Sequence, residues 1–304
     1  MSIRSPHPPL DSLNSRRAWA LVRQVARSFA LSLQILPATM RWPVALAYLL
    51  ARSSDTIADS AKPGSLDDPF ATQRLGALSA LDQAIRGSTD HHAHHPPPVG
   101  LDGIIRLVPS ASERELLQHL PDWLCSLREL PEPDRKLIVD VCSIIIEGQR
   151  MDLERFETKH PDSVQSLRTT EELEHYTWQV AGCVGSFWSL VCEAHHPGWR
   201  EAALDRMVDA GVKYGLGLQR LNLLRDTSED LALGRCYWPD EQLASVGMDA
   251  QKLVCAVKDR DMLALIPMLP LMKTWIHQTR AELSLGIAYG NGITSWRLRA
   301  ASAL

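Results

Sequence analysis

The sequence has no apolar run long enough to cross a membrane. Its two strongest apolar stretches, 43–51 and 262–272, fall short of the ~18 residues that a transmembrane helix needs, and the second contains two prolines. The amino terminus also lacks the apolar core of a secretory signal. We therefore expect a cytoplasmic protein without a transmembrane segment, although one that could contact a membrane surface.

Paired cysteine motifs and an excess of positive charge are also missing. The six cysteines include no C-x-x-C pair, and most lie in apolar stretches, where a free thiol packs like a small hydrophobic side chain. We expect reduced structural thiols rather than disulfides or a zinc site. The formal net charge of -4 argues against nucleic acid as a partner, because binding to a phosphate backbone favours a basic surface.

Apolar residues recur at three- and four-residue spacing through most of the chain, and no segment shows sustained two-residue alternation. The pattern predicts an all-α fold in a single domain spanning residues 1–304, with a flexible amino terminus at 1–14. Helices are predicted over 15–36, 38–60, 69–86, 112–130, 133–156, 170–194, 199–230 and 260–288.

Two of these helices are predicted to start with a capping box. Ser112 is followed by Glu115 and Thr169 by Glu172, the spacing at which the two side chains satisfy each other's backbone amides.

A His/Pro-rich segment at 87–100 interrupts the helical pattern. Four histidines in five positions could bind a transition metal, but no carboxylate stands at ligand spacing beside them. We interpret the segment as a flexible surface loop that ends in a polyproline turn.

Two segments carry paired aspartates. Asp55 and Asp59 follow an apolar run, and Asp226 and Asp230 end a predicted helix. At a four-residue spacing both carboxylates of a pair lie on one helix face, about one turn apart, where like charges repel. A divalent cation is the simplest compensation. Mg²⁺ is suitable because it uses few protein carboxylates and completes its coordination with water and phosphate oxygens.

Both pairs have polar neighbours that suit an anionic ligand, since arginine makes bidentate contacts with phosphate. These neighbours are Arg52 before the first pair, and Gln219, Asn222 and Arg225 before the second. A single Asp-x-x-x-Asp match is common by chance in a helical protein with 36 acidic residues. An intrahelical salt-bridge ladder would also account for the charges, but not for the apolar run before Asp55.

Weaker candidates lie elsewhere. Gly182 and Gly185 fall within a helical pattern, where each glycine costs ~1 kcal/mol relative to alanine. Close helix packing and a groove for a bulky apolar ligand explain them equally well. Glu147 and Asp152 could be polar groups near a cavity, but we expect them to be exposed. On pattern alone Arg27 is an ordinary surface residue of the first helix.

Three segments, which contain both aspartate pairs, their polar neighbours, Arg27 and the two glycines, closely resemble the squalene/phytoene synthase family. They read ARSFALSLQILPATMRWPVALAYLLARSSDTIAD, YTWQVAGCVG and LQRLNLLRDTSEDLALGRCYWPDE, and they occur in the family's order and at about its spacing. The GRCYWP sequence at 234–239 is more similar to squalene synthases than to phytoene synthases, which tend to have Leu-Pro there.

The resemblance implies an isoprenoid-synthase helical bundle around a central cavity, with the two aspartate pairs facing each other across it. It implies Mg²⁺ held by Asp55, Asp59, Asn222, Asp226 and Asp230. Arg27, Ser28, Arg52, Gln219, Asn222 and Arg225 would contact the diphosphates, and Tyr176 would assist proton transfer or stabilise cations.

The implied reaction joins two molecules of farnesyl diphosphate head to head into presqualene diphosphate, which NADPH then reduces to squalene. A phytoene or dehydrosqualene synthase, which lacks the hydride step, is the main alternative. A presqualene diphosphate or hydroxysqualene synthase is another. A terpene cyclase would share the metal chemistry but would not explain two such motifs. A helical scaffold would explain the periodicity but predicts no diphosphate binding.

The sequence departs from the family pattern in three places. Ala58 stands where many relatives have a further acid, and the chain ends at Leu304, where relatives usually continue with another helix. A truncated chain or a shortened cavity is therefore expected. No Lys/Arg-rich loop like the NADPH loop of eukaryotic squalene synthases is evident, so the residues that would bind NADPH are not predicted. Nor is the oligomeric state.

Overall fold

The computed structural model describes residues 16–26, 29–60, 71–89, 101–156 and 164–303. The predicted all-α fold is confirmed, because helices account for most of these residues and the only sheet among them is one two-stranded pair. The segment 1–14, residues 90–100 of the His/Pro-rich loop, and the candidate residues Arg27 and Ser28 lie outside the described part of the chain.

Fifteen α-helices are found in the described part of the chain. They are α1 (Arg16–Ala26), α2 (Phe29–Ile35), α3 (Ala38–Ala58), α4 (Ala71–Arg86), α5 (Leu101–Leu107), α6 (Ala111–Gln118), α7 (Leu120–Glu129), α8 (Glu132–Phe156), α9 (Thr170–Thr177), α10 (Cys183–His195), α11 (Leu204–Ala232), α12 (Asp240–Ser245), α13 (Ala250–Lys258), α14 (Leu269–Asn291) and α15 (Trp296–Ala303). Short 3₁₀ turns occupy Gly87–Thr89 and Ile266–Met268, and a π-helical turn occupies Trp178–Gly182.

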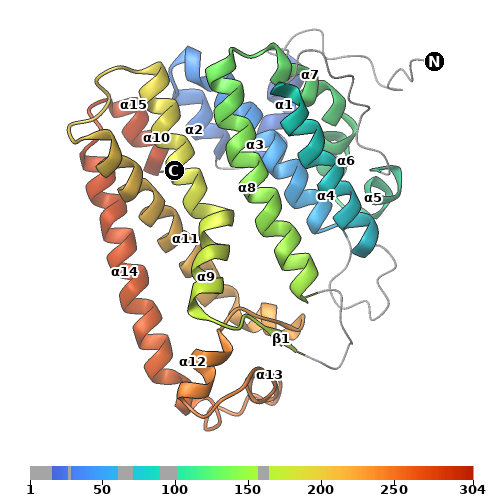
Figure 1. Cartoon of the computed structure of the whole chain (residues 1–304), viewed down its shortest axis with the longest axis vertical. Helices are drawn as coiled ribbons and strands as arrows, with labels where there is room; N and C mark the ends of the chain where they lie inside the picture. Colours follow the sequence, from blue (N-terminus) through green and yellow to red (C-terminus); the bar gives the residue numbers. More distant parts are fainter. Residues whose placement is uncertain (1–15, 27–28, 61–70, 90–100, 157–163, 304) are drawn as a thin grey trace.

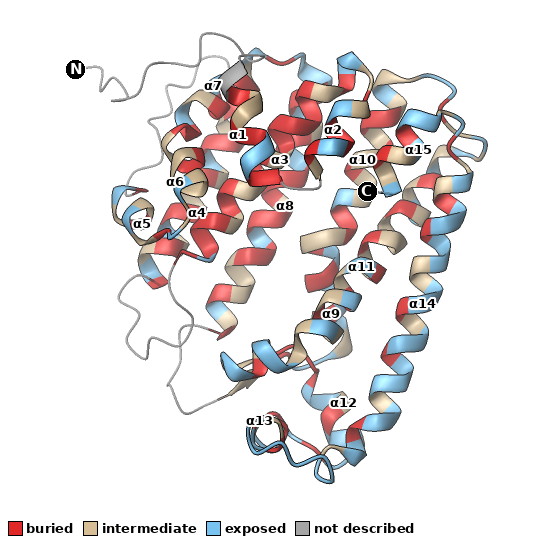
Figure 2. Cartoon of the chain, turned by 180° about the vertical axis from the view of Figure 1, so that it is seen from behind, coloured by how far each residue is buried: buried red, intermediate tan, exposed pale blue. Residues whose placement is uncertain are grey.

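Long helices form the body of the molecule. Helix α8 packs against α3, α4 and α10, while α11 packs between α10 and α14. Figure 1 shows α8, α11 and α14 running along the longest axis, with α12 and α13 at the lower end. Figure 2 shows that the buried residues of α3, α4 and α8 gather toward the middle of the bundle, whereas much of α14 is exposed. This arrangement follows from the three- and four-residue apolar spacing, which gives each helix one face to bury.

The hydrophobic core has two parts. The larger part is formed mainly by α1–α8 and α10, and the smaller, lower part by α9, α11–α14 and the segment after β2. In the lower part the rings of Trp238 and Trp275 stack 3.9 Å apart. Arg220, on α11, is almost fully buried there and pairs with Glu282 on α14, and its guanidinium lies 5.7 Å from the centre of the Trp275 ring. A paired and stacked guanidinium is one of the few ways to bury a charge, so this contact ties α11 to α14.

A two-residue parallel pair joins β1 (Gln165–Ser166) to β2 (Arg235–Cys236). No strand was predicted at either place, because two residues are too few to show alternation. The pair is nevertheless important for the site, because it fixes the segment that carries Arg235 and Tyr237.

The predicted helix at 112–130 is wrong in its continuity, because the structure has α6 and α7 with a break at His119. Pro121 lies in the first turn of α7, where a proline without an N–H is tolerated. The predicted Ser112 capping box is also wrong, since Ser110 caps α6 by accepting a hydrogen bond from the Glu113 amide.

The second predicted capping box is confirmed in its N-cap half, at the start of α9, whereas the Glu172 carboxylate accepts a hydrogen bond from the amide of Arg168 instead. The Thr169 hydroxyl accepts a hydrogen bond from the amide of Glu172, at 3.1 Å. A threonine oxygen at this position satisfies a backbone donor that the helix itself cannot.

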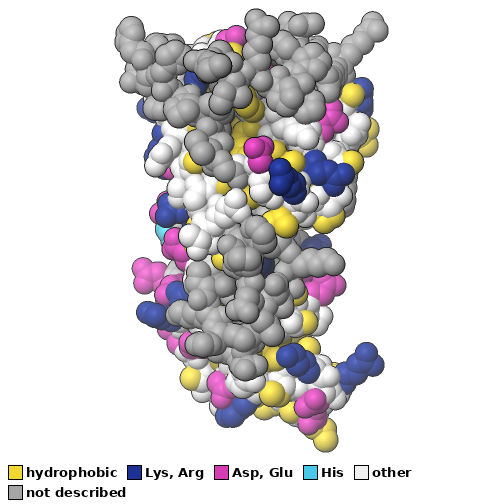
Figure 3. All heavy atoms as spheres, turned by 90° about the vertical axis from the view of Figure 1, so that its right-hand side faces the viewer, with side chains coloured by type: hydrophobic (Ala, Val, Ile, Leu, Met, Phe, Trp, Pro, Cys, Tyr) yellow, Lys and Arg dark blue, Asp and Glu magenta, His cyan; other side chains and the backbone are white. Residues whose placement is uncertain are grey.

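Within the described residues no helix is long and apolar enough to cross a bilayer. All six cysteines are free thiols, and four of them are buried. At the lower end of the molecule hydrophobic and basic side chains lie side by side on the surface (Figure 3).

Candidate active site

A polar cavity of about 300 Å³ lies where α3, α8, α9 and α11 meet the segment after β2. Such a volume is at the lower limit of small-molecule sites. Its lining joins several predicted residues to others that were not predicted: Asp55, Ala58, Asp59, Ile145, Gln149, Asp152, Leu153, Tyr176, Val180, Gln219, Arg235 and Tyr237. The structure thus brings the first aspartate pair together with Tyr176 and Gln219.

The first aspartate pair occupies the end of α3. Asp55 accepts a hydrogen bond from the side-chain amide of Gln149, and Arg52 Nη1 lies 3.8 Å from its carboxylate. Burial, and then the charge of Asp59 one turn away, raise the pKa of Asp55 to about 7. Two carboxylates held this closely carry an unfavourable charge, which a bound cation would relieve.

Arg52 is held by a second acid from another helix. Its other Nη atom forms a hydrogen-bonded ion pair with Glu113, in the first turn of α6. The guanidinium therefore stands at the edge of the cavity in a fixed orientation, between Glu113 and Asp55. Because guanidinium binds phosphate oxygens as readily as carboxylates, an incoming phosphate could replace one of these acids.

A cluster that the sequence did not predict forms another part of the cavity lining. The Tyr237 hydroxyl donates a 2.5 Å hydrogen bond to Asp152, and Arg235 lies 3.5 Å from the other oxygen of that carboxylate. The Tyr176 ring stacks on the Tyr237 ring with centres 5.2 Å apart. Asp152 was expected to be exposed, but its side chain is only 13% exposed; the expectation was right for Glu147.

Burial raises the pKa values of Tyr176 and Tyr237 well above their usual range. Both phenols are therefore protonated at neutral pH. They present hydroxyl groups and aromatic faces to the cavity, so they can orient a proton donor or acceptor and interact with a nearby positive charge.

The second aspartate pair is divided between two environments. Asp230 lines a small hollow that shares Arg235 and Tyr237 with the main cavity, and burial raises its pKa to about 6. Asp226 lies at the surface of α11 and forms two 2.6 Å hydrogen bonds with the exposed Arg225. These contacts lower the pKa of Asp226.

Asn222 lies on α11 between Gln219 and Asp226. Its amide is 3.5 Å from the side-chain oxygen of Gln219, a long hydrogen bond that keeps the two on one helix face. Neither Asn222, Arg225 nor Asp226 is among the residues that line the main cavity. In this structure α11 therefore presents Gln219 to the cavity directly, and Asp230 to the adjoining hollow.

The donor set fits Mg²⁺ better than a metal that needs a closed protein cage. Across the described ranges no three His, Cys, Asp or Glu side chains gather closely enough to hold an ion by themselves. Asp55 near Arg52 and Asp230 near Arg235, whose pKa values are raised, instead suit an ion that takes one or two protein ligands and completes its octahedron with phosphate and water.

An apolar cavity of about 390 Å³ adjoins the polar one, and Ile145 and Val180 line both. Its walls come from α2, α3, α8, α10, α11 and the π-helical turn, and Tyr289 and Ala301 contribute from α14 and α15. The π-helical turn separates Tyr176, in the polar cavity, from Gly185, in the apolar one. Such turns inside helices often occur at functional sites.

Gly185 lines the apolar cavity and also allows close helix packing. A Cβ atom on this residue would lie 2.0 Å from the carbonyl oxygen of Gly211, and one on Gly215 would lie 2.5 Å from that of Ala181. Both explanations proposed for the glycines in this tract therefore apply to Gly185, because α10 and α11 meet backbone to backbone beside the cavity.

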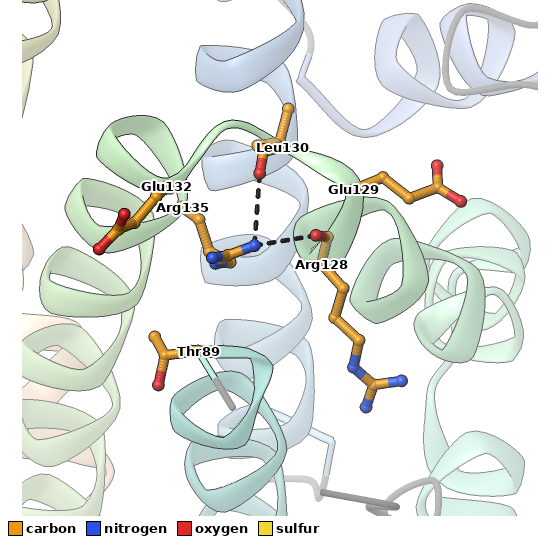
Figure 4. Close-up of a pocket in the computed structure, with 6 residues that line it drawn as sticks. All are labelled: Thr89, Arg128, Glu129, Leu130, Glu132 and Arg135. Carbon is orange, nitrogen blue, oxygen red and sulfur yellow. Dashed lines mark hydrogen bonds between the residues drawn. The ribbon is translucent and has the colours of Figure 1, made fainter. Parts of the chain in front are cut away.

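A separate hollow of about 500 Å³ lies at the turn between α7 and α8 (Figure 4). Arg135 extends into it and donates hydrogen bonds to the carbonyl oxygens of Arg128 and Leu130. These two hydrogen bonds stabilise the turn between α7 and α8. Glu129 and Glu132 also line the hollow. The hollow contains none of the predicted site residues, so it is a structural feature of this turn.

Replacing Tyr237 by phenylalanine is expected to lower the free energy of unfolding by about 2 kcal/mol, because the largely buried carboxyl of Asp152 loses the hydrogen bond that the Tyr237 hydroxyl donates. Urea denaturation followed by circular dichroism would measure the change. Tyr214→Phe is the matched control, and we expect a change within about 0.5 kcal/mol there. Equal effects in the two variants would show that the hydroxyl of Tyr237 does not stabilise the cluster.

Comparison with known proteins agrees with this geometry. Residues 22–303 match the squalene/phytoene synthase family. The squalene synthase of Eremothecium gossypii is 26% identical over 249 residues, covering 79% of this chain and 50% of that protein. The squalene synthase of Homo sapiens is 26% identical over 239 residues, covering 78% of this chain and 49% of that protein.

Other relatives carry a different name. A bifunctional lycopene cyclase/phytoene synthase of Leptosphaeria maculans is 25% identical over 248 residues, covering 80% of this chain and 37% of that protein. The chain spans about half the length of the squalene synthases that it matches.

Solved structures share the fold. The squalene synthase HpnC of Alicyclobacillus acidocaldarius superposes with a TM-score of 0.58 at 19% identity, covering 95% of this chain and 88% of that one. A ligand complex of TcSQS gives a TM-score of 0.68 at 21% identity, covering 95% of this chain and 74% of that one. With the match over residues 22–303, these findings place the chain in the squalene/phytoene synthase family.

Proposed function

We propose that the chain condenses two molecules of farnesyl diphosphate head to head into presqualene diphosphate and reduces that product with NADPH to squalene. One observation carries the proposal: an acidic cavity that suits Mg²⁺ and diphosphate adjoins an apolar cavity that suits prenyl chains, and Ile145 and Val180 line both. We also propose that residues 1–304 form a single domain.

The two aspartate pairs would hold Mg²⁺ together with Asn222. The ion would neutralise the charge that develops on the departing diphosphate. Asp55 and Asp59 already lie together in the polar cavity, and Asp230 lies beside it. Asp226 would join them once Arg225 releases it, and both side chains are accessible enough to turn.

Four described residues would bind the diphosphates: Arg52, Gln219, Asn222 and Arg225. Arg52 stands ready because Glu113 and Asp55 fix its guanidinium at the cavity edge. Arg225 is exposed and pairs only with its neighbour Asp226 among the contacts of the described chain, so a diphosphate could attract it. Arg27 and Ser28 remain predictions from the sequence.

The tyrosines would act on the hydrocarbon part of the reaction. Departure of one diphosphate leaves an allylic cation, which the double bond of the second substrate attacks, and loss of a proton then closes the cyclopropane ring. The stacked faces of Tyr176 and Tyr237 can stabilise the positive charge. Tyr176 lines the polar cavity, where its hydroxyl could guide the leaving proton.

The apolar cavity would protect these cations from water. Its lining is almost entirely hydrocarbon and aromatic, including Phe29, Phe187 and Trp188. A cation formed beside such a wall is kept from hydrolysis and can rearrange. NADPH, when bound, would supply the hydride that ends the reaction as the second diphosphate leaves.

The experiment that tests the proposal is a product analysis. Purified protein is incubated with farnesyl diphosphate and Mg²⁺, with and without NADPH, and the extracted hydrocarbons are identified by gas chromatography and mass spectrometry. We expect squalene only when NADPH is present, presqualene diphosphate without it, and no product when EDTA removes the metal.

The other outcomes identify the alternatives. Dehydrosqualene, formed with or without NADPH, would assign the chain to the condensation without a hydride step, and hydroxysqualene would indicate that water ends the reaction. Product from geranylgeranyl diphosphate alone would indicate a phytoene synthase. The alternative is supported by the bifunctional lycopene cyclase/phytoene synthase of Leptosphaeria maculans, whose sequence identity to this chain is similar to that of the squalene synthases.

A further inference from the structure

An apolar surface at the lower end of the molecule is not used by the proposed reaction. It consists of Met262, Leu263, Ile266, Leu269, Met272 and Ile276, which we call the end patch, and these side chains belong to the apolar run singled out in the sequence and to the first turns of α14. Their exposed fractions are 72, 77, 53, 50, 40 and 44%. Contiguous exposure of this kind marks an interaction surface in a soluble protein.

The end patch is not part of the hydrophobic core of the protein. The inner face of the same segment is already buried, since Met268 and Trp275 pack into the lower core and Trp275 stacks on Trp238. Leu269, Met272 and Ile276 follow one another at three- and four-residue spacing, so they form a continuous stripe on the outer face of α14. This helix is apolar on both sides, and only one side is covered by the fold.

The charges around the end patch are predominantly positive, although the chain as a whole carries a net charge of -4. Between Asp261 and Glu282 the sequence has no acid, while Lys273 and Arg280 lie exposed on α14. Lys258 and Arg260 precede the patch and are exposed as well. The local acids are Asp259 and Asp261, and Asp261 accepts hydrogen bonds from the amides of Leu263 and Ala264.

Arg260 supplies an independent observation. It follows the end of α13 with a φ of 53°, in the left-handed region that glycine adopts without strain. Arginine at this place costs stability that glycine would not, yet it puts a cation beside the end patch. The positive charge of Arg260 thus stands at a backbone position that favours glycine, where it lies beside the end patch and does not serve folding.

We propose that the end patch docks the protein onto an anionic lipid surface. The apolar side chains would enter the boundary between headgroups and acyl chains, while Lys258, Arg260, Lys273 and Arg280 contact anionic headgroups. Figure 1 places α13 and the start of α14 at one end of the long axis. The proposal does not depend on which product the enzyme makes.

Vesicle co-sedimentation tests the proposal with the full chain. We expect the protein to bind vesicles of phosphatidylcholine that contain ~30% phosphatidylglycerol, to bind pure phosphatidylcholine at least about tenfold less, and to be released by high salt. The double variant Leu263→Ser/Ile266→Ser should bind at least about tenfold less than the parent protein. Leu285→Ser/Ile287→Ser, in exposed positions of the same helix outside the patch, should bind like the parent.

Arg260→Gly separates binding from folding. It removes a cation and relieves the left-handed backbone, so we expect a Tm equal to or above that of the parent together with several-fold weaker vesicle binding. Three results would overturn the proposal: no binding to anionic vesicles, unchanged binding of the Leu263→Ser/Ile266→Ser variant, or a dimer of the parent in analytical ultracentrifugation that this variant abolishes. The last result would assign the patch to a second copy of the chain.

Discussion

Replacing Asp55 by asparagine is expected to reduce turnover by on the order of 10³-fold or more and to stabilise the metal-free protein at pH 8. The loss of turnover follows from the proposed role of Asp55 as a Mg²⁺ ligand at the departing diphosphate. The gain in stability follows from the carboxylate's environment, in which burial and the charge of Asp59 raise its pKa from 3.8 to about 7. One substitution therefore separates what this residue does for function from what it costs the fold.

The sign of the stability effect depends on pH. The unfolded chain releases the Asp55 proton near pH 4, whereas the folded protein keeps it until about pH 7. Stability therefore falls as the pH rises through this window, and the penalty is complete above it. Because the side chain is 43% exposed and partly screened by water, we expect Asp55→Asn to recover only about 1 kcal/mol at pH 8, a rise in Tm of about 2 °C.

Thermal unfolding in EDTA at pH 8 and pH 4.5, together with the product assay, measures both effects. The variant should be more stable than the parent at pH 8 and close to it at pH 4.5, where the folded parent holds its proton. Asp140→Asn, at an exposed position of α8, is the matched control and should leave turnover unchanged. Turnover near the parent level in Asp55→Asn would remove Asp55 from the proposed metal site. A lower Tm at pH 8 would show that the carboxylate stabilises the fold.

Local patterns predicted much of the fold and half of the site. Apolar spacing located the long helices, because each of them buries one face against the core. The spacing of Asp55 and Asp59, with Arg52 before them, identified one wall of the cavity from a single helix. The wall was predictable because all three residues lie within two turns of one another.

The remaining part of the site could not be predicted, because it is assembled from distant segments. Asp152 meets Tyr237 and Arg235 across more than eighty positions of sequence, through a β pair of two residues a strand. No spacing rule connects those residues. The contact between Glu113 and Arg52 was not predicted for the same reason, because Glu113 lies on another helix. That helix was predicted to start at residue 112, one residue after its observed start at Ala111. Composition and periodicity describe one element at a time, and contacts between elements depend on how the elements pack.

The division of the second aspartate pair has a similar origin. The four-residue spacing put Asp226 and Asp230 on one helix face, and they do share a face of α11. The end of α11 lies at the margin of the cavity, so one aspartate is partly buried beside Arg235 while the other pairs with Arg225 at the surface. The spacing of two residues predicts whether they share a helix face. It does not predict how far the neighbouring helices extend along that face, and therefore which of the two residues is buried.

Replacing Gly185 by alanine is expected to lower the free energy of unfolding by about 3 kcal/mol, the largest stability effect that we predict for a single methyl group. The new Cβ would lie 2.0 Å from the carbonyl oxygen of Gly211 and 2.8 Å from the amide nitrogen of Val212. Both are backbone atoms, so no side chain can rotate away, and α10 must move off α11. That movement would also open the wall of the apolar cavity, which Gly185 and Gly211 both line.

Urea denaturation of the purified variant measures the loss, with Gly76→Ala as the control. Gly76 lies exposed in the middle of α4 with nothing within 4 Å of its Cβ position, so alanine there should stabilise the protein by about 0.5–1 kcal/mol. Opposite signs for two glycine-to-alanine changes in helices can only come from contacts between helices. If Gly185→Ala were as stable as the parent, α10 and α11 would not meet backbone to backbone, and the glycine would serve only the shape of the apolar cavity. Reduced prenyl-diphosphate turnover at unchanged stability would then be the expected consequence.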